Sequence, residues 1–260
     1  MKRCYVDIPE GQVHYRTEGS GEPILLLHQT PSSSNNYAGV IPILAQKYRV
    51  IAMDTLGYGD SDKPPQQYQI NDYARSVTSF LDALDIGKTH VAGHHTGGII
   101  GVELATEYPE RVNKLILSDC SCRKQPEEGQ MMLNRIQEFP IKADGSHLTR
   151  LWQTFVGMMG GEPSQAALEV LQTGIIDYLK AGPRVEEGHK AAFIYDNYAK
   201  LPLIKCPTLL LYGNKGMLFP YHNVCHSLVP NNTMKILEGS GDPIQMPREW
   251  AQAVLDFLAS

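Results

Sequence analysis

Six short, largely apolar stretches recur along the chain, and they constrain its fold more than any other feature. They span residues 24–28, 49–54, 90–94, 115–118, 208–212 and 234–237. A strand that is buried on both faces reads as a continuous apolar run rather than as an alternating one. Amphipathic helical stretches, such as residues 71–84, separate several of these runs. The alternation predicts a doubly wound α/β fold with a mostly parallel sheet.

Further elements are predicted on either side of this core. Residues 4–9 and 12–18 have the pattern of two short strands, with Gly11 at the turn between them. Residues 36–47 and 250–258 are compatible with helices. A further helix is predicted to begin at Gly97, after the third apolar run, and to end at Tyr108, before Pro109.

The strand–helix rhythm stops between residues 122 and 200. That region shows helical patterns at residues 131–139, 147–159, 164–180 and 187–195. We therefore predict a core formed by residues 1–121 and 201–260, interrupted by a helical cap at residues 122–200. The cap is rich in Met, Tyr and Trp, including Trp152. These side chains either form the cap's own core or provide an adaptable apolar lid over a small organic ligand.

Composition excludes several classes of protein. The 260 residues carry a net charge of −5 and show no cluster of basic residues, which argues against a nucleic-acid-binding protein. The sequence contains no window of about 18 apolar residues, so no membrane span is predicted. The N-terminal residues contain no apolar run that could serve as a secretion signal. The five cysteines are an odd number in a long chain, which is typical of free thiols in a reducing cytoplasm. We expect a cytoplasmic protein with a small-molecule substrate; a homodimer is compatible with the sequence, which leaves the oligomeric state open.

Polar and glycine-rich segments follow each buried run. In a parallel α/β sheet the carboxyl ends of the strands carry the chemistry, so these segments are the candidate site. They are His28-Gln29-Thr30-Pro31, residues 54–62, Gly93-His94-His95-Thr96-Gly97, Asp119-Cys120-Ser121, Gly213-Asn214-Lys215-Gly216 and Gly239-Ser240-Gly241-Asp242.

Taken in order, these segments resemble the α/β-hydrolase superfamily from about residue 12 to the C-terminus. Residues 28–31 are similar to its H-G-x-P oxyanion loop, and residues 93–97 to its G-x-nucleophile-x-G elbow. Residues 54–61 resemble its D-x-x-G-x-G-x-S loop. Tyr212-Gly213 with Pro220 resembles the loop that holds the family's acid, and residues 239–242 resemble the loop that holds its catalytic histidine. The resemblance implies an α/β-hydrolase fold, with a mostly parallel eight-stranded sheet flanked by helices and a cap inserted after the sixth strand.

All three residues of the family's usual triad are replaced. The elbow position is His95, the position of the acid is Gly216, and the position of the catalytic histidine is Asp242. An acyl-enzyme on serine therefore cannot form at the elbow. The replacements form a swap, because the two sites face each other in this fold and a reversed His95–Asp242 pair remains available. Asp119, at the end of the preceding strand, is a second candidate carboxylate.

His95 has the chemistry of a general base, because an imidazole titrates near neutral pH. The resemblance implies that the backbone N–H groups of Thr30 and Thr96 form an oxyanion hole. A base with an oxyanion hole favours hydrolysis of an ester, a lactone or a C–C bond in a small, largely apolar carbonyl compound. Two alternatives remain open: a cofactor-free lyase or isomerase that abstracts a proton, and a non-catalytic ligand-binding protein.

Five residues are predicted to border the substrate pocket: His28, Gln29, Tyr37, Tyr58 and Trp152. His28 resembles a residue that braces loops in the family, and a packing role is equally open for the two tyrosines. Residues 93–98 lack the spacing of a dinucleotide fingerprint, and no phosphate-binding loop is present. The histidine spacing fits no metal motif. We therefore predict no metal and no other cofactor.

Overall fold

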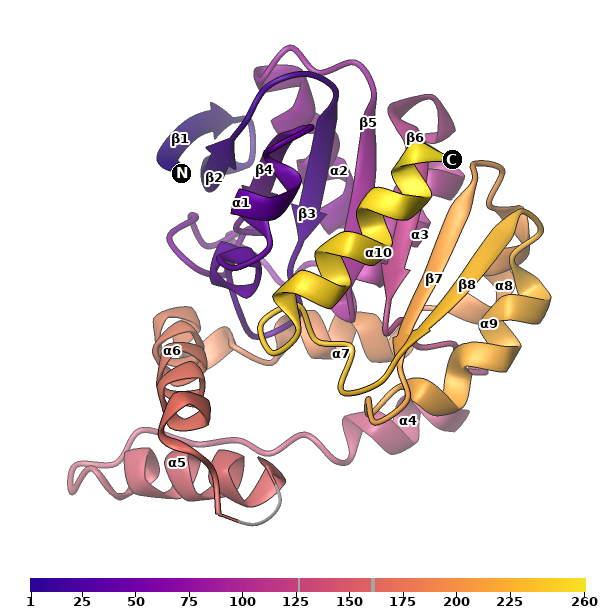
Figure 1. The fold of residues 1–260 in the computed structure, drawn as a ribbon. Coiled ribbons are helices and arrows are strands. Elements are labelled where there is room, and N and C mark those ends of the chain that lie inside the picture. Colours follow the sequence, from indigo (N-terminus) through magenta and orange to yellow (C-terminus); the bar gives the residue numbers. More distant parts are fainter. Residues whose placement is uncertain (126, 160–161) are drawn as a thin grey trace.

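The computed structural model describes residues 1–125, 127–159 and 162–260, and its centre is one eight-stranded sheet (Figure 1). The strand order is β1-β2-β4-β3-β5-β6-β7-β8. β1 pairs antiparallel with β2, and β2 pairs antiparallel with β4, whereas the remaining neighbours are parallel. The predicted α/β-hydrolase fold with a mostly parallel sheet is confirmed. The strands are β1 (Lys2–Ile8), β2 (Gly11–Glu18), β3 (Pro23–Leu27), β4 (Arg49–Met53), β5 (Thr89–His94), β6 (Val112–Ser118), β7 (Thr208–Gly213) and β8 (Asn232–Leu237).

Helices cover both faces of the sheet, which explains why the central strands are apolar along their whole length. In β3, Leu25 and Leu27 face one core cluster while Ile24 and Leu26 face the other. Both clusters exclude water, so neither face of the strand tolerates a polar side chain. The first face is covered by α2 (Ile70–Ala83), α3 (Thr96–Glu107) and α9 (His222–Leu228), and the second by α1 (Ile41–Leu44) and α10 (Pro247–Ala259).

The helix predicted at residues 36–47 is wrong as a single element. The chain instead forms a 3-10 turn at Ser34–Tyr37 and the short helix α1. Gly39 lies in the break, where a side chain would come within 2.9 Å of Pro247. Pro42 stands in the first turn of α1, where its missing N–H costs nothing. The break therefore follows from a close approach to the C-terminal helix, which local periodicity does not reveal.

Among the described residues, five α-helices lie between β6 and β7, in the region for which the sequence predicts a cap. They are α4 (Glu127–Leu133), α5 (Ser146–Met159), α6 (Gln165–Ala181), α7 (Glu187–Ile194) and α8 (Asn197–Lys200). The first of them ends at Leu133, whereas the sequence predicts a helix over residues 131–139, so the predicted bounds of this helix are wrong. Helices α5 and α6 project away from the sheet, whereas α7 runs below the strand ends (Figure 1). That these helices act as a separate cap stays a prediction.

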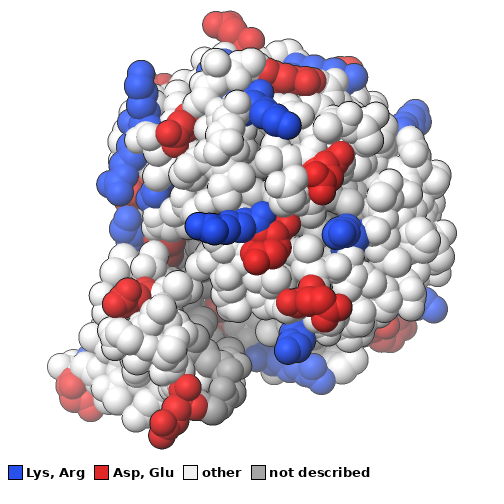
Figure 2. Space-filling view, viewed as in Figure 1, with Lys and Arg blue, Asp and Glu red and all other residues white. Residues whose placement is uncertain are grey.

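The projecting helices form a smaller lobe beside the main body in the space-filling view (Figure 2). Acidic and basic side chains are interspersed over most of the face shown, and uncharged residues cover most of it. No helix in the described part of the chain is long and apolar enough to cross a lipid bilayer. All five cysteines are free thiols, as the odd count predicts.

Buried polar contacts join the inserted helices to the core. On α6, the buried carboxylate of Asp177 accepts a 2.7 Å hydrogen bond from Ser33. The Tyr58 hydroxyl donates to the Val185 carbonyl at 3.0 Å and accepts from the Gly188 amide at 2.8 Å. Gly188 is required here, because a side chain on it would lie 2.4 Å from the Thr30 hydroxyl. The start of α7 is therefore packed directly onto the loop after β3.

Candidate active site

His95 stands at a sharp turn between β5 and α3. Its φ of 49° and ψ of −113° are outside the regions that ordinary residues prefer, and such strain costs about 1–3 kcal/mol. Gly93 and Gly97 make the turn possible. A side chain on Gly93 would lie 2.1 Å from the Gly97 carbonyl oxygen, and one on Gly97 would lie 2.0 Å from the carbonyl oxygen of Leu27. The chain thus holds an imidazole at the position and in the geometry of a nucleophile elbow.

The His95 ring is neutral at pH 7 and free to accept a proton. It is only partly exposed and stacks on the His94 ring, with the centroids 4.2 Å apart. Burial lowers the pKa of His95 well below its ordinary value, the neighbouring His94 imidazole lowers it further, and the Asp242 carboxylate raises it. Among the hydrogen bonds of the described residues, none involves the His95 ring. A neutral imidazole without a partner is suited to proton abstraction.

His94, at the end of β5, belongs to a buried polar network beside His95. Its Nδ1 lies 2.9 Å from the Ser118 hydroxyl, which accepts a 2.8 Å hydrogen bond from the indole N–H of Trp250. Ser118 can therefore donate its own proton to Nδ1, which places the His94 proton on Nε2. That nitrogen lies 3.8 Å from the Asp242 carboxylate. Burial lowers the pKa of His94 to about 3, so this ring is a neutral structural group.

Two carboxyl groups reach the same region from the loops after β6 and β8. Asp119 accepts a 3.3 Å hydrogen bond from the Gly213 amide, and Asp242 accepts one of 2.6 Å from the Ile244 amide. Burial, and then the charge of Asp242, raise the pKa of Asp119 to about 7. Burial also raises the pKa of Asp242, although the Ile244 amide and His95 oppose this shift. Near neutral pH Asp119 is therefore protonated in about half of the molecules.

The structure explains why glycine occupies the family's acid position. A side chain on Gly216 would approach an Asp119 carboxylate oxygen to 3.0 Å, and one on Gly241 would approach the other oxygen to 2.5 Å. The carboxyl group of Asp119 thus fills the space beside Gly216. Donor and acceptor atoms of Asp119, His94 and His95 lie within 4.8 Å of one another. Both predicted carboxylates are brought to the elbow, and neither is hydrogen-bonded to His95 in the described part of the chain.

The two predicted oxyanion donors lie on facing backbone segments. Thr96 is the first residue of α3, so its N–H has no acceptor within the helix. Thr30 follows the end of β3, which is the segment that Gly97 touches. Neither N–H donates to another group in the turn and loop hydrogen bonds of the described residues. Their use as an oxyanion hole stays a prediction that this geometry allows.

Two of the predicted pocket residues are structural instead. His28 is 2 % exposed; its Nδ1 lies 2.8 Å from the Gln29 carbonyl oxygen and its Nε2 accepts from the Thr55 amide at 3.0 Å. It braces two loops, as its family counterpart does. Tyr37 is fully buried against Trp250, with its hydroxyl donating to the Leu27 carbonyl at 2.8 Å. Both side chains have used their polar atoms in the core and present none to a substrate.

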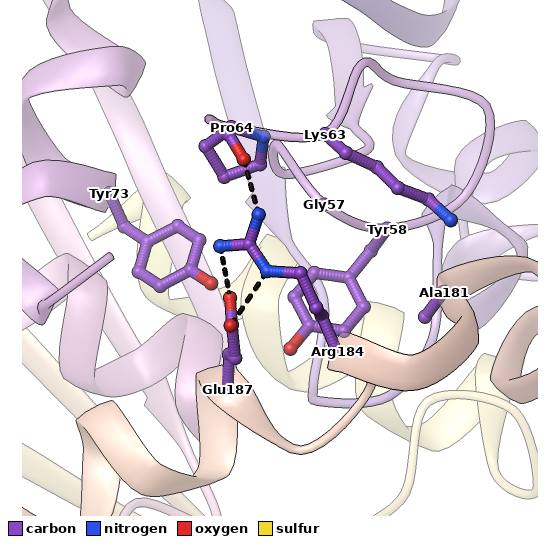
Figure 3. Close-up of a pocket in the computed structure, with 8 residues that line it drawn as sticks. All are labelled: Gly57, Tyr58, Lys63, Pro64, Tyr73, Ala181, Arg184 and Glu187. Atoms are coloured by element: carbon purple, nitrogen blue, oxygen red, sulfur yellow. Dashed lines mark hydrogen bonds and ion pairs between the residues drawn. The ribbon is translucent and has the colours of Figure 1, made fainter. Parts of the chain in front are cut away.

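The other three predicted pocket residues lie at the edge of the site or away from it. Gln29 is partly exposed at the end of β3. Tyr58 borders a small pocket at the seam between the loop after β4, α2 and the inserted helices (Figure 3). Trp152 is half-buried on α5, which packs against α6 and lies apart from the strand ends in Figure 1. The structure therefore does not bring Trp152 to the elbow.

Two basic side chains near His95 have no local sequence pattern that marks them as part of the site. His189, on α7, and Arg123, after β6, both lower the pKa of His95. His189 stacks on Phe193, with ring centroids 5.6 Å apart, and its Nδ1 lies 2.7 Å from a Glu186 carboxylate oxygen. Only the position of Arg123 in the sequence could have indicated its place near the site, because it lies two residues beyond the segment that follows the fourth apolar run.

A metal ion has two candidate sets of ligands in the described residues. One is His94, His95 and Asp119, and the other is His14, Asp54 and Asp60. In the first set the two imidazoles are stacked with only 28° between their planes, so their in-plane lone pairs do not converge. In the second, His14 and Asp54 already form a 2.8 Å pair. Neither arrangement matches a coordination geometry closely, and the predicted absence of a metal stays a prediction.

Comparison with known proteins identifies the family. Residues 22–249 match the alpha/beta hydrolase fold family, and the chain belongs to it. An uncharacterized protein of Mycobacterium tuberculosis, Rv2715, is 28% identical over 247 residues, which cover 87% of this chain and 72% of that protein. The 2-hydroxy-6-oxo-6-(2'-aminophenyl)hexa-2,4-dienoic acid hydrolase of Metapseudomonas resinovorans is 37% identical over 110 residues, covering 41% of this chain and 38% of the relative.

The fold is also similar to solved structures. The crystal structure of a hydrolase from Pseudomonas aeruginosa superimposes with a TM-score of 0.80 at 22% identity, over 100% of this chain and 99% of that one. At this identity the likeness shows the fold alone. Family membership and the hydrolase relative support a hydrolase-like enzyme.

Proposed function

We propose that this protein hydrolyses a small, largely apolar carbonyl compound, with His95 as the general base and without a serine nucleophile. The observation that carries the proposal is the strained elbow, which presents a neutral, unpartnered imidazole. A chain that had lost its activity would have no reason to retain a strained non-glycine residue between two obligatory glycines. This argues against the non-catalytic alternative.

The reaction follows from the positions of the groups. A water molecule beside His95 gives a proton to the imidazole while its oxygen attacks the carbonyl carbon. The negative charge that develops on the carbonyl oxygen is stabilised by the N–H groups of Thr30 and Thr96. When the tetrahedral intermediate collapses, the bond to the leaving group breaks and the imidazolium returns its proton to that group. The Asp242 carboxylate stabilises the transient imidazolium, since it already raises the pKa of His95.

The proposed class of substrate rests on a relative of this protein. The Metapseudomonas resinovorans relative is named as a hydrolase of an oxo acid, so a ketone that is cleaved at a C–C bond is a substrate type to test beside esters and lactones.

A second candidate function is a cofactor-free lyase or isomerase. One specific observation favours it: the pKa of Asp119 is raised to about 7, which provides an acid beside a base. In such a reaction His95 takes a proton from the carbon next to a carbonyl group, and Asp119 returns a proton to the resulting enolate. Product analysis in H₂¹⁸O separates the two functions, because only hydrolysis places ¹⁸O in the product.

The test of the proposal is turnover on a panel of esters, lactones and diketones by the wild-type protein and by His95→Ala. Loss of turnover with ligand affinity kept within about tenfold is expected, since a base that acts in the transition state adds little to ground-state binding. His226→Ala, at an exposed histidine, is the matched control and should keep full activity. A serine-directed fluorophosphonate should not label the protein. Retained turnover in His95→Ala, or labelling that abolishes activity, would refute the mechanism.

A further inference from the structure

Arg123 is a buried cation without an acidic partner. The residue lies between β6 and α4 and is 6 % exposed. In the part of the chain that the structure describes, no carboxylate lies within ion-pair distance of its guanidinium. Nη1 donates a 2.7 Å hydrogen bond to the Ser121 hydroxyl, whereas the buried Nε has no partner. Burying an arginine without a counter-charge is costly, so such residues usually serve a ligand.

Aromatic rings hold this guanidinium in place without neutralising it. The guanidinium carbon lies over the Phe193 ring of α7, 5.1 Å from its centroid, and over the Tyr221 ring, 5.6 Å from its centroid. These cation–π contacts come from a helix of the inserted segment and from the loop after β7. With Nη1 bound to Ser121, the edge formed by Nε and Nη2 makes no hydrogen bond to the described residues.

Another arginine of this protein shows what that edge is suited to bind. Arg184 donates from Nε to one oxygen of Glu187 at 2.7 Å and from Nη2 to the other oxygen at 2.6 Å (Figure 3). This is the bidentate arrangement in which a guanidinium matches a carboxylate. The same edge of Arg123 makes no hydrogen bond to the described residues, and Arg123 is more deeply buried than Arg184. A carboxylate from a bound ligand would match this edge in both charge and geometry.

The open edge lies within electrostatic reach of the elbow. Ser121, which holds Nη1, is two residues beyond Asp119. Phe193, which covers the guanidinium, also stacks on His189. Arg123 and His189 both lower the pKa of His95, so both lie near its ring. A ligand of modest size bound at Arg123 therefore extends toward His95.

We propose that Arg123 binds the carboxylate of an anionic substrate through Nε and Nη2, so that the natural substrate is an organic acid whose carbonyl group lies at His95. The carboxylate site stands on the contacts of Arg123 alone, whereas the assignment of its ligand as the substrate rests on the proposed function. A buried site of this kind discriminates strongly, because a neutral analogue leaves the guanidinium unpaired.

The test measures binding without turnover. Isothermal titration at fixed ionic strength compares 4-phenylbutyrate with 4-phenylbutyramide, and benzoate with benzamide, so that each pair differs in the charged group. The proteins are the wild type, Arg123→Gln, Arg123→Lys and the matched control Arg184→Gln. The wild type should prefer the carboxylate by about tenfold or more, in line with hydrogen bonds to charged groups. In Arg123→Gln the preference should fall to within about twofold, in Arg123→Lys a part should remain, and in Arg184→Gln it should be unchanged.

Three results would overturn the inference: equal binding of acid and amide by the wild type, a preference that survives in Arg123→Gln, or no carboxylate binding below about 10 mM. If Arg123 served only packing, its variants would lower the melting temperature without a carboxylate preference to lose. The inference and the proposed function can fail separately. His95→Ala should keep the carboxylate preference, so a protein that binds acids selectively but turns over no substrate refutes the function and leaves the site.

Discussion

Replacing Asp119 by asparagine should stabilise the protein, and by an amount that depends on pH. The side chain is 1 % exposed, and its pKa is raised to about 7 by burial and then by the charge of Asp242. In the unfolded chain an aspartate titrates near 3.9. The folded state therefore holds a proton that the unfolded state releases between these two pH values, so the stability of the wild type falls as the pH rises through this interval.

The size of the effect follows from the two pKa values. Each pH unit between them is worth about 1.36 kcal/mol, so the full cost of the ionised Asp119 is about 4 kcal/mol above pH 7. Below pH 4 both states are protonated and the cost is absent. Asparagine never ionises, and its side-chain oxygen can still accept the Gly213 amide. The advantage of Asp119→Asn should therefore rise from about zero at pH 4 to about 4 kcal/mol at pH 8.

Urea unfolding followed by circular dichroism at pH 4.5, 6 and 8 gives the free energies for both proteins. Subtracting them at each pH removes the titration of all groups that the two proteins share. Asp256→Asn, at an exposed aspartate, is the control and should differ little from the wild type at any pH. A difference between Asp119→Asn and wild type that does not change with pH would show that Asp119 titrates normally in the folded protein. The conclusion that burial and Asp242 raise the pKa of Asp119 would then be wrong.

Three further predictions concern the elbow and its support. The kcat/KM of the wild type should stay level when the pH falls from 7.5 to 6, because the pKa of His95 lies well below its ordinary value; an acidic limb centred near 6.5 would contradict this. Asp242→Asn should lower kcat by tenfold or more with little change in KM, since the carboxylate stabilises the imidazolium only during reaction; an unchanged kcat would point to Asp119. Gly188→Ala should cost about 1–3 kcal/mol of stability in urea unfolding, because the new methyl group lies 2.4 Å from the Thr30 hydroxyl oxygen; Gly174→Ala, with open space around it, is the control and should not lose stability.

The central strands could be predicted from sequence because a two-sided apolar environment leaves a local mark. All six apolar runs became strands, and their bounds moved by only a few residues. The elbow could also be predicted from sequence, because its sharp turn requires glycine at positions 93 and 97 whichever residue stands between them. The helix at residues 36–47 could not be predicted correctly, because its break depends on contact with α10, which is more than 200 residues away.

The charges around His95 depend on tertiary structure in the same way. The sequence placed Asp242 and Asp119 as candidate carboxylates, but their pKa values follow from burial beside each other. His28 and Tyr37 looked like pocket residues, and only their hydrogen bonds show that their polar atoms are already used. Arg123 carried no local pattern, because its significance lies in the lack of an acidic partner among the described residues.

By itself, the sequence determined an α/β-hydrolase fold with histidine at the elbow, since apolar runs and obligatory glycines are local requirements of the backbone. The tertiary structure alone decided which charged groups surround that histidine. Electrostatic interactions act between residues that are distant in the chain, and their strength is set by burial, so a neutral His95, a protonated Asp119 and an unpaired Arg123 appear only once the chain is folded.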